Sequence, residues 1–324
     1  MTPRLIVLCG FACAALALAL ASGSSGWGYA AADIVWQVRA PRVLAGFGAG
    51  AALALAGALM QLLTRNALAD PYVLGVSGGA SVGALAAIAI GAALGAHGEW
   101  LVVGGAMAGA IGAAALLFAL SWRFLGRGGV AASGETSVAL LLVGVMIGTA
   151  SSAIVSMLLV LASDVQLRGM VFWLLGDLDG ATEGWLACAG ACVALALAWP
   201  RARELDWLAR GDAWASTLGV PVARRRRLAL LAAALATATA VATAGPIGFV
   251  GLIVPHALRL LGLRDATVLL PACVLAGGTF VVLADAIART LVAPQQLPVG
   301  VIAAVVGVPA FLALLLPAGR GVRA

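Results

Sequence analysis

Long uncharged apolar runs follow one another along the whole sequence, and short segments between them carry the charges. Most runs reach the length that an α-helix needs to cross a bilayer. Gly245 and Pro246 interrupt the longest run, 228–258, which as one helix would measure about 46 Å, so we divide it into two spans. The runs cover residues 5–21, 43–63, 72–96, 101–121, 138–162, 185–199, 228–258, 268–284 and 299–316. The pattern predicts an all-α polytopic membrane protein with about ten transmembrane helices.

Composition and charge agree with that prediction. Hydrophobic residues make up 63% of the chain and charged residues 10%, against about a quarter charged in soluble domains. The 19 basic residues are all arginine and the formal charge is +6. With ten spans and a cytoplasmic N-terminus, fifteen arginines lie inside and only Arg39, Arg42, Arg168 and Arg289 lie outside, as the positive-inside rule requires. We therefore expect both termini in the cytoplasm and no nucleic-acid partner.

The N-terminal run resembles a signal peptide, because Arg4 precedes apolar residues and small residues follow them. It is equally long enough for a first span, and we favour an uncleaved span because a polytopic protein needs no separate cleaved signal. We expect a single transmembrane domain over residues 1–324, with a cytoplasmic loop at 200–227. The five cysteines lie in apolar runs and are interpreted as packing residues: Cys9, Cys13, Cys188, Cys192 and Cys273.

Several kinds of function are disfavoured by the residues themselves. The chain has no lysine, so it cannot carry the phosphate-binding motif G-x-x-x-x-G-K-[ST], and any ATPase must be a separate polypeptide. An ion-coupled carrier usually has an acidic group near the bilayer midplane. Here Asp285 comes closest, but Arg289 follows one turn later, which indicates a structural ion pair. His97 and His256 lie too far apart in sequence to indicate a metal site, and no nucleophile–base set of an enzyme is present.

Six segments, in order and at matching spacing, carry a resemblance to a known family. They are RAPRVL at 39–44, QLLTRNALADPYVLGVSGGA at 61–80, GFVGLIVPHALR at 248–259, LADAIAR at 283–289, LPVGVI at 297–302 and GVP at 307–309. From about residue 35 to its C-terminus, the chain resembles the permeases of bacterial ABC importers for iron–siderophore complexes, haem and cobalamin.

The resemblance implies a type II ABC importer permease in the bacterial inner membrane. It implies a homodimer with the substrate path between the copies, one cytoplasmic ATPase subunit on each copy, and a periplasmic substrate-binding protein outside. ATP would be bound by the partner subunits and the iron complex would be the substrate. Haem is favoured by overall likeness alone, and cobalamin and ferric siderophores remain open. The alternative function is an ion-coupled secondary transporter of a small hydrophobic solute.

In the family that the chain resembles, arginines at the positions of Arg39, Arg42 and Arg289 bind carboxylates of the binding protein. Guanidinium suits this role because it stays charged and binds carboxylate in a bidentate fork. The alternatives are that the first two snorkel to lipid headgroups and that Asp285 already holds Arg289.

The resemblance also implies a coupling knob, residues 212–224, whose short helices sit in a groove of the ATPase. Gly219 and Pro221 break the helix there and would give a compact shape. The predicted contact residues are Ser216, Thr217, Leu218, Gly219, Val220, Pro221 and Arg224. The arginine run 224–227 is better explained as a topological anchor.

A cytoplasmic gate and a transport path are carried over in the same way. The gate residues are Ser77, Gly78 and Gly79 with Thr136 and Ser137, of which the last two could instead cap a helix with Glu135. The path residues are Met146, Thr149, Ser152 and Ser156, whose hydroxyls could equally bond to their own helix. Met146, Met157 and Met170 are interpreted as packing residues rather than haem contacts.

Overall fold

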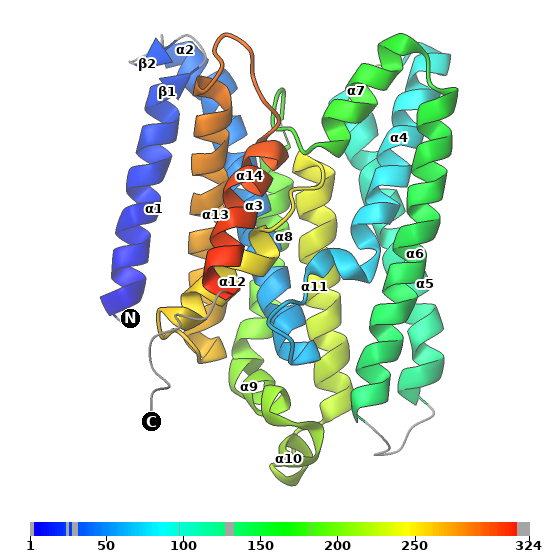
Figure 1. The fold of residues 1–324 in the computed structure, drawn as a ribbon, viewed down its shortest axis with the longest axis vertical. Coiled ribbons are helices and arrows are strands. Elements are labelled where there is room, and N and C mark those ends of the chain that lie inside the picture. Colours follow the sequence, from blue (N-terminus) through cyan, green and yellow to red (C-terminus); the bar gives the residue numbers. More distant parts are fainter. Residues whose placement is uncertain are drawn as a thin grey trace.

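The computed structural model describes residues 3–23, 26–27, 32–96, 98–126, 133–181 and 183–315. His97, Arg127, Arg320 and Arg323 lie outside them. The described part is a bundle of helices with one short hairpin (Figure 1). Its elements are α1 (Pro3–Ala21), β1 (Ser22–Gly23), β2 (Gly26–Trp27), α2 (Ala32–Ile34), the π-helix η1 (Val35–Arg39), α3 (Ala40–Thr64), the 3₁₀-helix η2 (Pro71–Leu74), α4 (Val76–Leu94), α5 (Glu99–Gly126), α6 (Ser133–Leu161), α7 (Asp164–Leu174), α8 (Gly184–Ala198), the 3₁₀-helix η3 (Trp199–Arg201), α9 (Ala202–Arg210), α10 (Asp212–Thr217), α11 (Val222–Ala244), α12 (Val250–Leu260), α13 (Ala266–Thr290) and α14 (Val299–Leu315).

The predicted fold class is confirmed. In the described ranges, eight helices are long and apolar enough to cross a membrane, and two shorter apolar helices, Val250–Leu260 and Val299–Leu314, bring the set to ten. The division of the run 228–258 is also confirmed, since α11 ends at Ala244 and α12 begins at Val250. Gly245 has φ +66°, a left-handed value that glycine adopts without strain, and Pro246 follows it.

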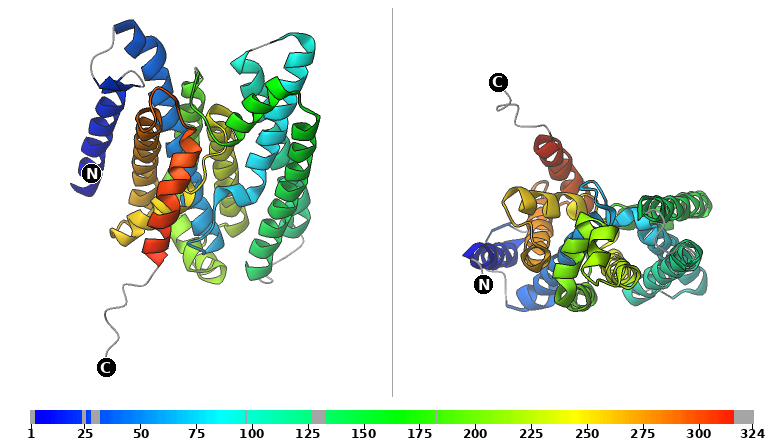
Figure 2. Two further views of the ribbon diagram at one scale, coloured as in Figure 1. Left: turned by 45° about the horizontal axis from the view of Figure 1, so that its top comes forward. Right: turned by 90° about the horizontal axis from the view of Figure 1, so that it is seen from below.

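Helix α3 is the centre of the bundle, and α8, α11, α12 and α13 all pack against it. Its alanines and glycines let neighbouring backbones come close, which is how helices associate in lipid. A Cβ at Gly57 would lie 1.9 Å from the carbonyl oxygen of Gly251 in α12, and a Cβ at Gly50 would lie 2.2 Å from that of Gly277 in α13. Helix α1 lies at one edge of the bundle and α5 and α6 lie toward the other (Figure 2).

The predicted run 72–96 is divided in the structure, which places the start of α4 inside the bundle. The Asp70 carboxylate accepts a hydrogen bond from the Tyr72 amide at 2.8 Å and starts η2, and Gly75 at φ +74° ends it. The Tyr72 hydroxyl donates to the carbonyl of Ile247, before α12, at 2.8 Å. Helix α4 therefore begins beside the turn between α11 and α12, rather than at the end of the bundle as the apolar run suggested.

Helix α7 was not predicted, because its polar residues interrupt the apolar pattern between 162 and 185. The Gln166 side chain accepts a hydrogen bond from the Ser163 amide at 3.1 Å, which fixes the start of the helix. Met170 points inward and is fully buried, as the packing interpretation of this methionine predicts. All five cysteines are free, and Cys273 is buried.

Candidate functional site

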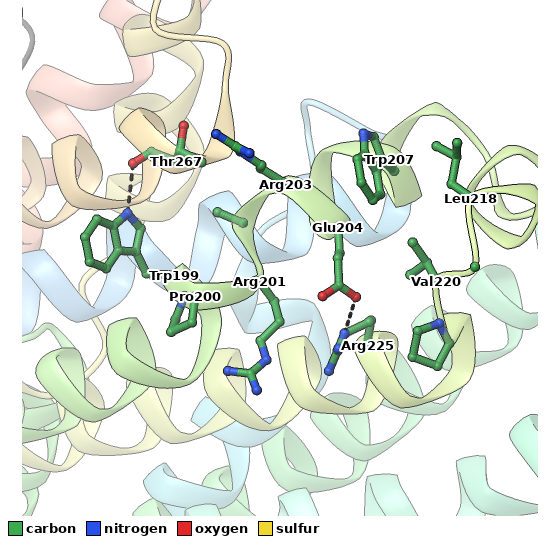
Figure 3. Close-up of a pocket in the computed structure, with 13 residues that line it drawn as sticks. Trp199, Pro200, Arg201, Arg203, Glu204, Trp207, Leu218, Val220, Arg225 and Thr267 are labelled. Atoms are coloured by element: carbon green, nitrogen blue, oxygen red, sulfur yellow. Dashed lines mark hydrogen bonds and ion pairs between the residues drawn. The ribbon is translucent and has the colours of Figure 1, made fainter.

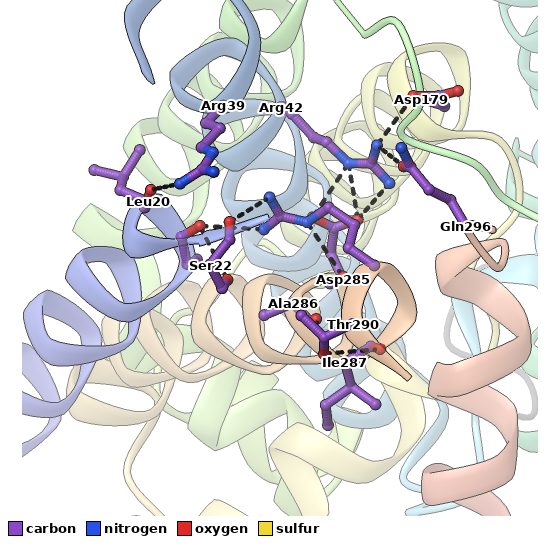
Figure 4. A network of polar contacts seen from close by, with 12 residues as sticks. Leu20, Ser22, Arg39, Arg42, Asp179, Asp285, Ala286, Ile287, Thr290 and Gln296 are labelled. Carbon is purple, nitrogen blue, oxygen red and sulfur yellow. Dashed lines mark hydrogen bonds and ion pairs between the residues drawn. The ribbon is translucent and has the colours of Figure 1, made fainter. Parts of the chain in front are cut away.

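Three of the four arginines outside the positive-inside trend meet in one polar network, which we call the outer arginine network (Figure 4). Asp285 of α13 is its centre. Its carboxylate contacts Nη2 of Arg42 at 3.0 Å and Nε of Arg289 at 3.0 Å. Arg42 also contacts Asp179, in the segment before α8, at 3.1 Å, and donates to Gln296 before α14. The network thus joins α3, α13 and two connecting segments, and it confirms the predicted Asp285–Arg289 ion pair.

The charged groups of this network are enclosed by the chain itself. Arg39, Arg42 and Arg289 are 5%, 5% and 4% exposed, and Asp285 is 2% exposed. Arg39 donates to the carbonyl of Leu20 at 2.9 Å, and Arg289 donates to those of Ser22 and Ala19 at 3.2 and 3.3 Å. The snorkelling alternative does not describe this arrangement, because these guanidinium groups are directed to partners within the chain. Docking of a binding protein by these arginines stays a prediction.

The connecting segment before α8 adds two carboxylates to the network. Asp179 has a side chain that is 64% exposed, so its pair with Arg42 lies at the surface. Asp177 accepts a hydrogen bond from the Asp179 amide at 3.0 Å. Burial raises the pKa of the Asp177 carboxyl above its ordinary value, and the hydrogen bond and the charge of Arg42 oppose that shift. Sequence reasoning missed Asp179 and Gln296, since only the fold brings them to Arg42.

The predicted path residues form one stripe along α6, on a face that no other part of the described chain covers. Met146, Thr149, Ser152 and Ser156 are all exposed, with intervals of three, three and four residues. The three hydroxyls donate to carbonyls four residues earlier, at 2.9, 3.0 and 2.9 Å. These hydroxyls therefore bond to carbonyls of their own helix, which was the alternative interpretation of these residues. The stripe offers a mildly polar wall with no unsatisfied donor.

The predicted gate residues are not brought together within one copy. Gly78 and Gly79 lie in the first turn of α4 and pack closely on α6 and α5: a Cβ at Gly78 would lie 2.8 Å from that of Ser151, and one at Gly79 would lie 2.5 Å from the Gly109 carbonyl oxygen. Ser77 is partly exposed beside them. Ser137 precedes Ser151 by fourteen residues of α6, which is about 21 Å of helix. The side chains of Thr136 and Ser137 lie outside the described residues.

The coupling knob is a compact projection built on α10. Asp212, at its start, contacts Arg65 at the end of α3 at 2.7 Å and Arg226 of α11 at 2.9 Å. Ala215 and Val220 are buried beneath it. Gly211 and Gly219 have φ of +141° and +78°, so glycine suits both turns. The exposed predicted contact residues are Ser216, Thr217, Leu218, Gly219, Pro221 and Arg224.

Two features of the knob escaped the sequence analysis. Trp214 is 54% exposed and lies on the same projection as Leu218, which is 46% exposed. The arginine run opens α11 and does more than mark topology, because Arg225 pairs with Glu204 of α9 and Arg226 with Asp212. The coupling knob is therefore fixed to α3, α9 and α11, so a displacement of the knob would be transmitted to these three helices. Figure 1 shows that α1 begins, and α14 ends, toward the end of the bundle that carries α10.

Comparison with known proteins gives consistent matches. The sequence profile described as the FecCD transport family matches residues 5–317. The vitamin B12 import system permease protein BtuC of Shigella sonnei is 41% identical over 288 residues, which cover 88% of this chain and 84% of that protein. The protein of the same name from Escherichia coli O139:H28 is 40% identical over the same shares. A solved structure, a metal-chelate type ABC transporter in an inward-facing conformation, matches with a TM-score of 0.85 and 27% identity, covering 97% of this chain and 99% of that one.

Proposed function

The chain belongs to the FecCD transport family and is the permease of an ABC importer, and we propose that the cargo it moves inward is cobalamin. The observation that carries this proposal is the identity of 41%, over most of both chains, to a vitamin B12 import permease. The overall sequence resemblance favoured haem as the cargo, but no individual residue supports that choice. Cobalamin and haem are both large metal chelates, so the family alone does not separate them.

The geometry supports a path formed by two copies of the chain in the inner membrane. The stripe on α6 is exposed in a single copy, and its hydroxyls are satisfied within the helix. A wall of this kind offers no strong contact that would retain a large ligand. We propose that α6 of each copy lines the path, with Met146, Thr149, Ser152 and Ser156 facing it. The gate would then have two parts at different depths along the path, one at Ser77–Gly79 and one at Thr136 and Ser137.

We further propose that the coupling knob binds a separate ATPase subunit and faces the cytoplasm with both termini. Its support is the exposed apolar surface of Trp214 and Leu218 on a projection held by ion pairs. ATP would act only on that partner. At the opposite end, a periplasmic binding protein would deliver the cargo.

Transport by purified components tests the cargo directly. The chain and its ATPase are placed in liposomes with the cognate binding protein and ATP, and uptake of labelled cobalamin and of haem is measured. We expect ATP-dependent uptake of cobalamin and at least tenfold less of haem. Uptake of haem but not of cobalamin would refute the cargo proposal, while the assignment as an importer would still hold. Uptake that does not depend on ATP and is abolished by an ionophore would support the ion-coupled alternative.

Docking by the outer arginines predicts a specific mutant phenotype. Arg42 and Arg289 are unsuitable for the test, since changing either leaves Asp285 with one partner fewer. Arg39 donates a hydrogen bond to the carbonyl of Leu20, and glutamine can donate as well, so Arg39→Gln is expected to keep the fold. Because Arg39 is only 5% exposed, its charge would act on carboxylates of the binding protein at longer range, and we expect its removal to weaken binding of that protein about tenfold. The measurement is binding-protein affinity for the permease in nanodiscs. Arg168→Gln, an exposed outer arginine on α7, is the matched control, and equal affinities in the two variants would contradict the role.

A further inference from the structure

A cavity of about 590 Å³ opens beside the coupling knob, where α8 passes through η3 into α9 (Figure 3). Trp199 and Trp207 form part of its wall, and residues 218–221 of the knob close one side. The Trp199 indole donates to the carbonyl of Thr267 at 2.9 Å, which fixes the ring at the rim. The cavity is therefore a preformed hollow between the end of a membrane helix and the knob.

Positive charge dominates this cavity. Arg201, Arg203 and Arg225 line it, against a single carboxylate, that of Glu204. Glu204 is paired with Arg225, and Figure 3 shows Arg201 on the same side of α9 as that pair. The two guanidinium groups leave α9 on opposite sides, Arg203 toward Thr267 and Arg201 toward the Glu204–Arg225 pair (Figure 3), and no carboxylate of the described residues pairs with either of them.

Exposed apolar side chains also lie on α8, the helix that leads through η3 to this cavity. Val193 and Leu197 lie one turn apart on α8, and both are exposed, as is Trp199 at its end. Tryptophan at such a position is typical of the interface between hydrocarbon and headgroups. Acyl chains can lie along this face of α8 while a headgroup reaches the arginines.

We propose that this cavity binds the phosphate-bearing headgroup of an anionic phospholipid of the inner leaflet. Arg203, on the side of Trp199 and Thr267, contacts the phosphate, and Arg201 adds positive charge from the other side of α9. Trp199 packs at the level of the glycerol, and the acyl chains follow Val193 and Leu197 on α8. Basic pockets on the cytoplasmic side of membrane proteins bind anionic headgroups through this chemistry. Because residues 218–221 form one wall, the bound lipid also braces the coupling knob. The proposal rests on the proposed orientation, with the knob in the cytoplasm.

Native mass spectrometry of the full-length chain, with and without its ATPase, tests the proposal. The probes are dioleoylphosphatidylglycerol, dioleoylphosphatidylcholine and inorganic phosphate. We expect the phosphatidylglycerol adduct to be at least tenfold tighter than the phosphatidylcholine adduct, and the double variant Arg201→Gln/Arg203→Gln to abolish that preference. The matched control is Arg210→Gln, two turns beyond Arg203 on α9 and outside the cavity lining, which should change the preference less than twofold.

Three results with the permease alone would overturn the lipid site. They are equal binding of the two lipids, equal loss of preference in the control variant, and displacement of phosphatidylglycerol by inorganic phosphate at equal concentration. Loss of the adduct when the ATPase binds would show instead that the cavity belongs to the subunit interface. A chain that imports its cargo but shows no lipid preference contradicts only this proposal, so the two failures are distinguishable. Gel filtration and thermal unfolding establish that each variant is folded before it is scored.

Discussion

Asp285→Ala is expected to lower the free energy of unfolding by about 3–5 kcal/mol, the typical result of removing one partner from a buried ion pair. Asp285 is 2% exposed and contacts both Arg42 and Arg289 at 3.0 Å. Its removal leaves two buried positive charges close together with no carboxylate between them. Thermal unfolding of the purified permease in detergent, with the yield of folded protein, measures the effect.

Two further variants make this prediction specific. Asp285→Asn keeps the shape and the acceptor oxygen but removes the charge, so we expect a smaller loss of stability than for alanine. Asp179→Ala removes the other carboxylate that contacts Arg42, but that side chain is 64% exposed, and exposed pairs contribute about 1 kcal/mol or less. If the two alanine variants proved equally stable, Asp285 would not be the centre of the network.

Leu218→Glu is expected to reduce ATP-driven uptake about thirtyfold or more, the equivalent of at least about 2 kcal/mol lost at a central contact of an interface. Leu218 is 46% exposed on the coupling knob, so a charge there costs the fold little. In the proposed complex the same charge would be buried against the ATPase without a partner. Uptake into liposomes and co-purification of the ATPase measure the two consequences.

An exposed leucine elsewhere at the same end of the bundle is the control for this charge. Leu261, directly after α12, is 66% exposed and lies outside the knob. Leu261→Glu should leave co-purification of the ATPase within twofold of the unsubstituted chain. A Leu218→Glu permease that still binds its ATPase and transports normally would show that the knob surface is not the contact.

The sequence predicts the helices well because of a constraint that acts locally. In a bilayer each backbone amide and carbonyl must find its partner within the same helix, so an apolar run of sufficient length becomes a span. Gly245 and Pro246 divide a run for equally local reasons, and α11 and α12 separate there. The same local reasoning failed at residues 162–185, where α7 is stabilised by a cap and by the burial of Met170 rather than by an apolar stretch.

The motifs likewise located the knob and the stripe on α6, because both depend on residues adjacent in sequence. They could not show that Asp212 fixes the knob to α3 and α11, or that Trp214 shares its exposed surface. Nor could they show that the two parts of the predicted gate lie about 21 Å apart along α6, a separation set by where η2 returns into the bundle.

The outer arginines show most clearly which features the sequence predicts and which only the tertiary structure decides. Sequence alone determined that Arg39, Arg42 and Arg289 lie against the charge bias and that Asp285 stands one turn before Arg289. Only the fold decided that Arg42, 243 residues away, shares the same carboxylate, and that the chain encloses all three guanidinium groups. A helix needs only its own backbone hydrogen bonds, whereas the partner of a charged side chain depends on which distant segments the packing of α3 against α13 brings within about 3 Å.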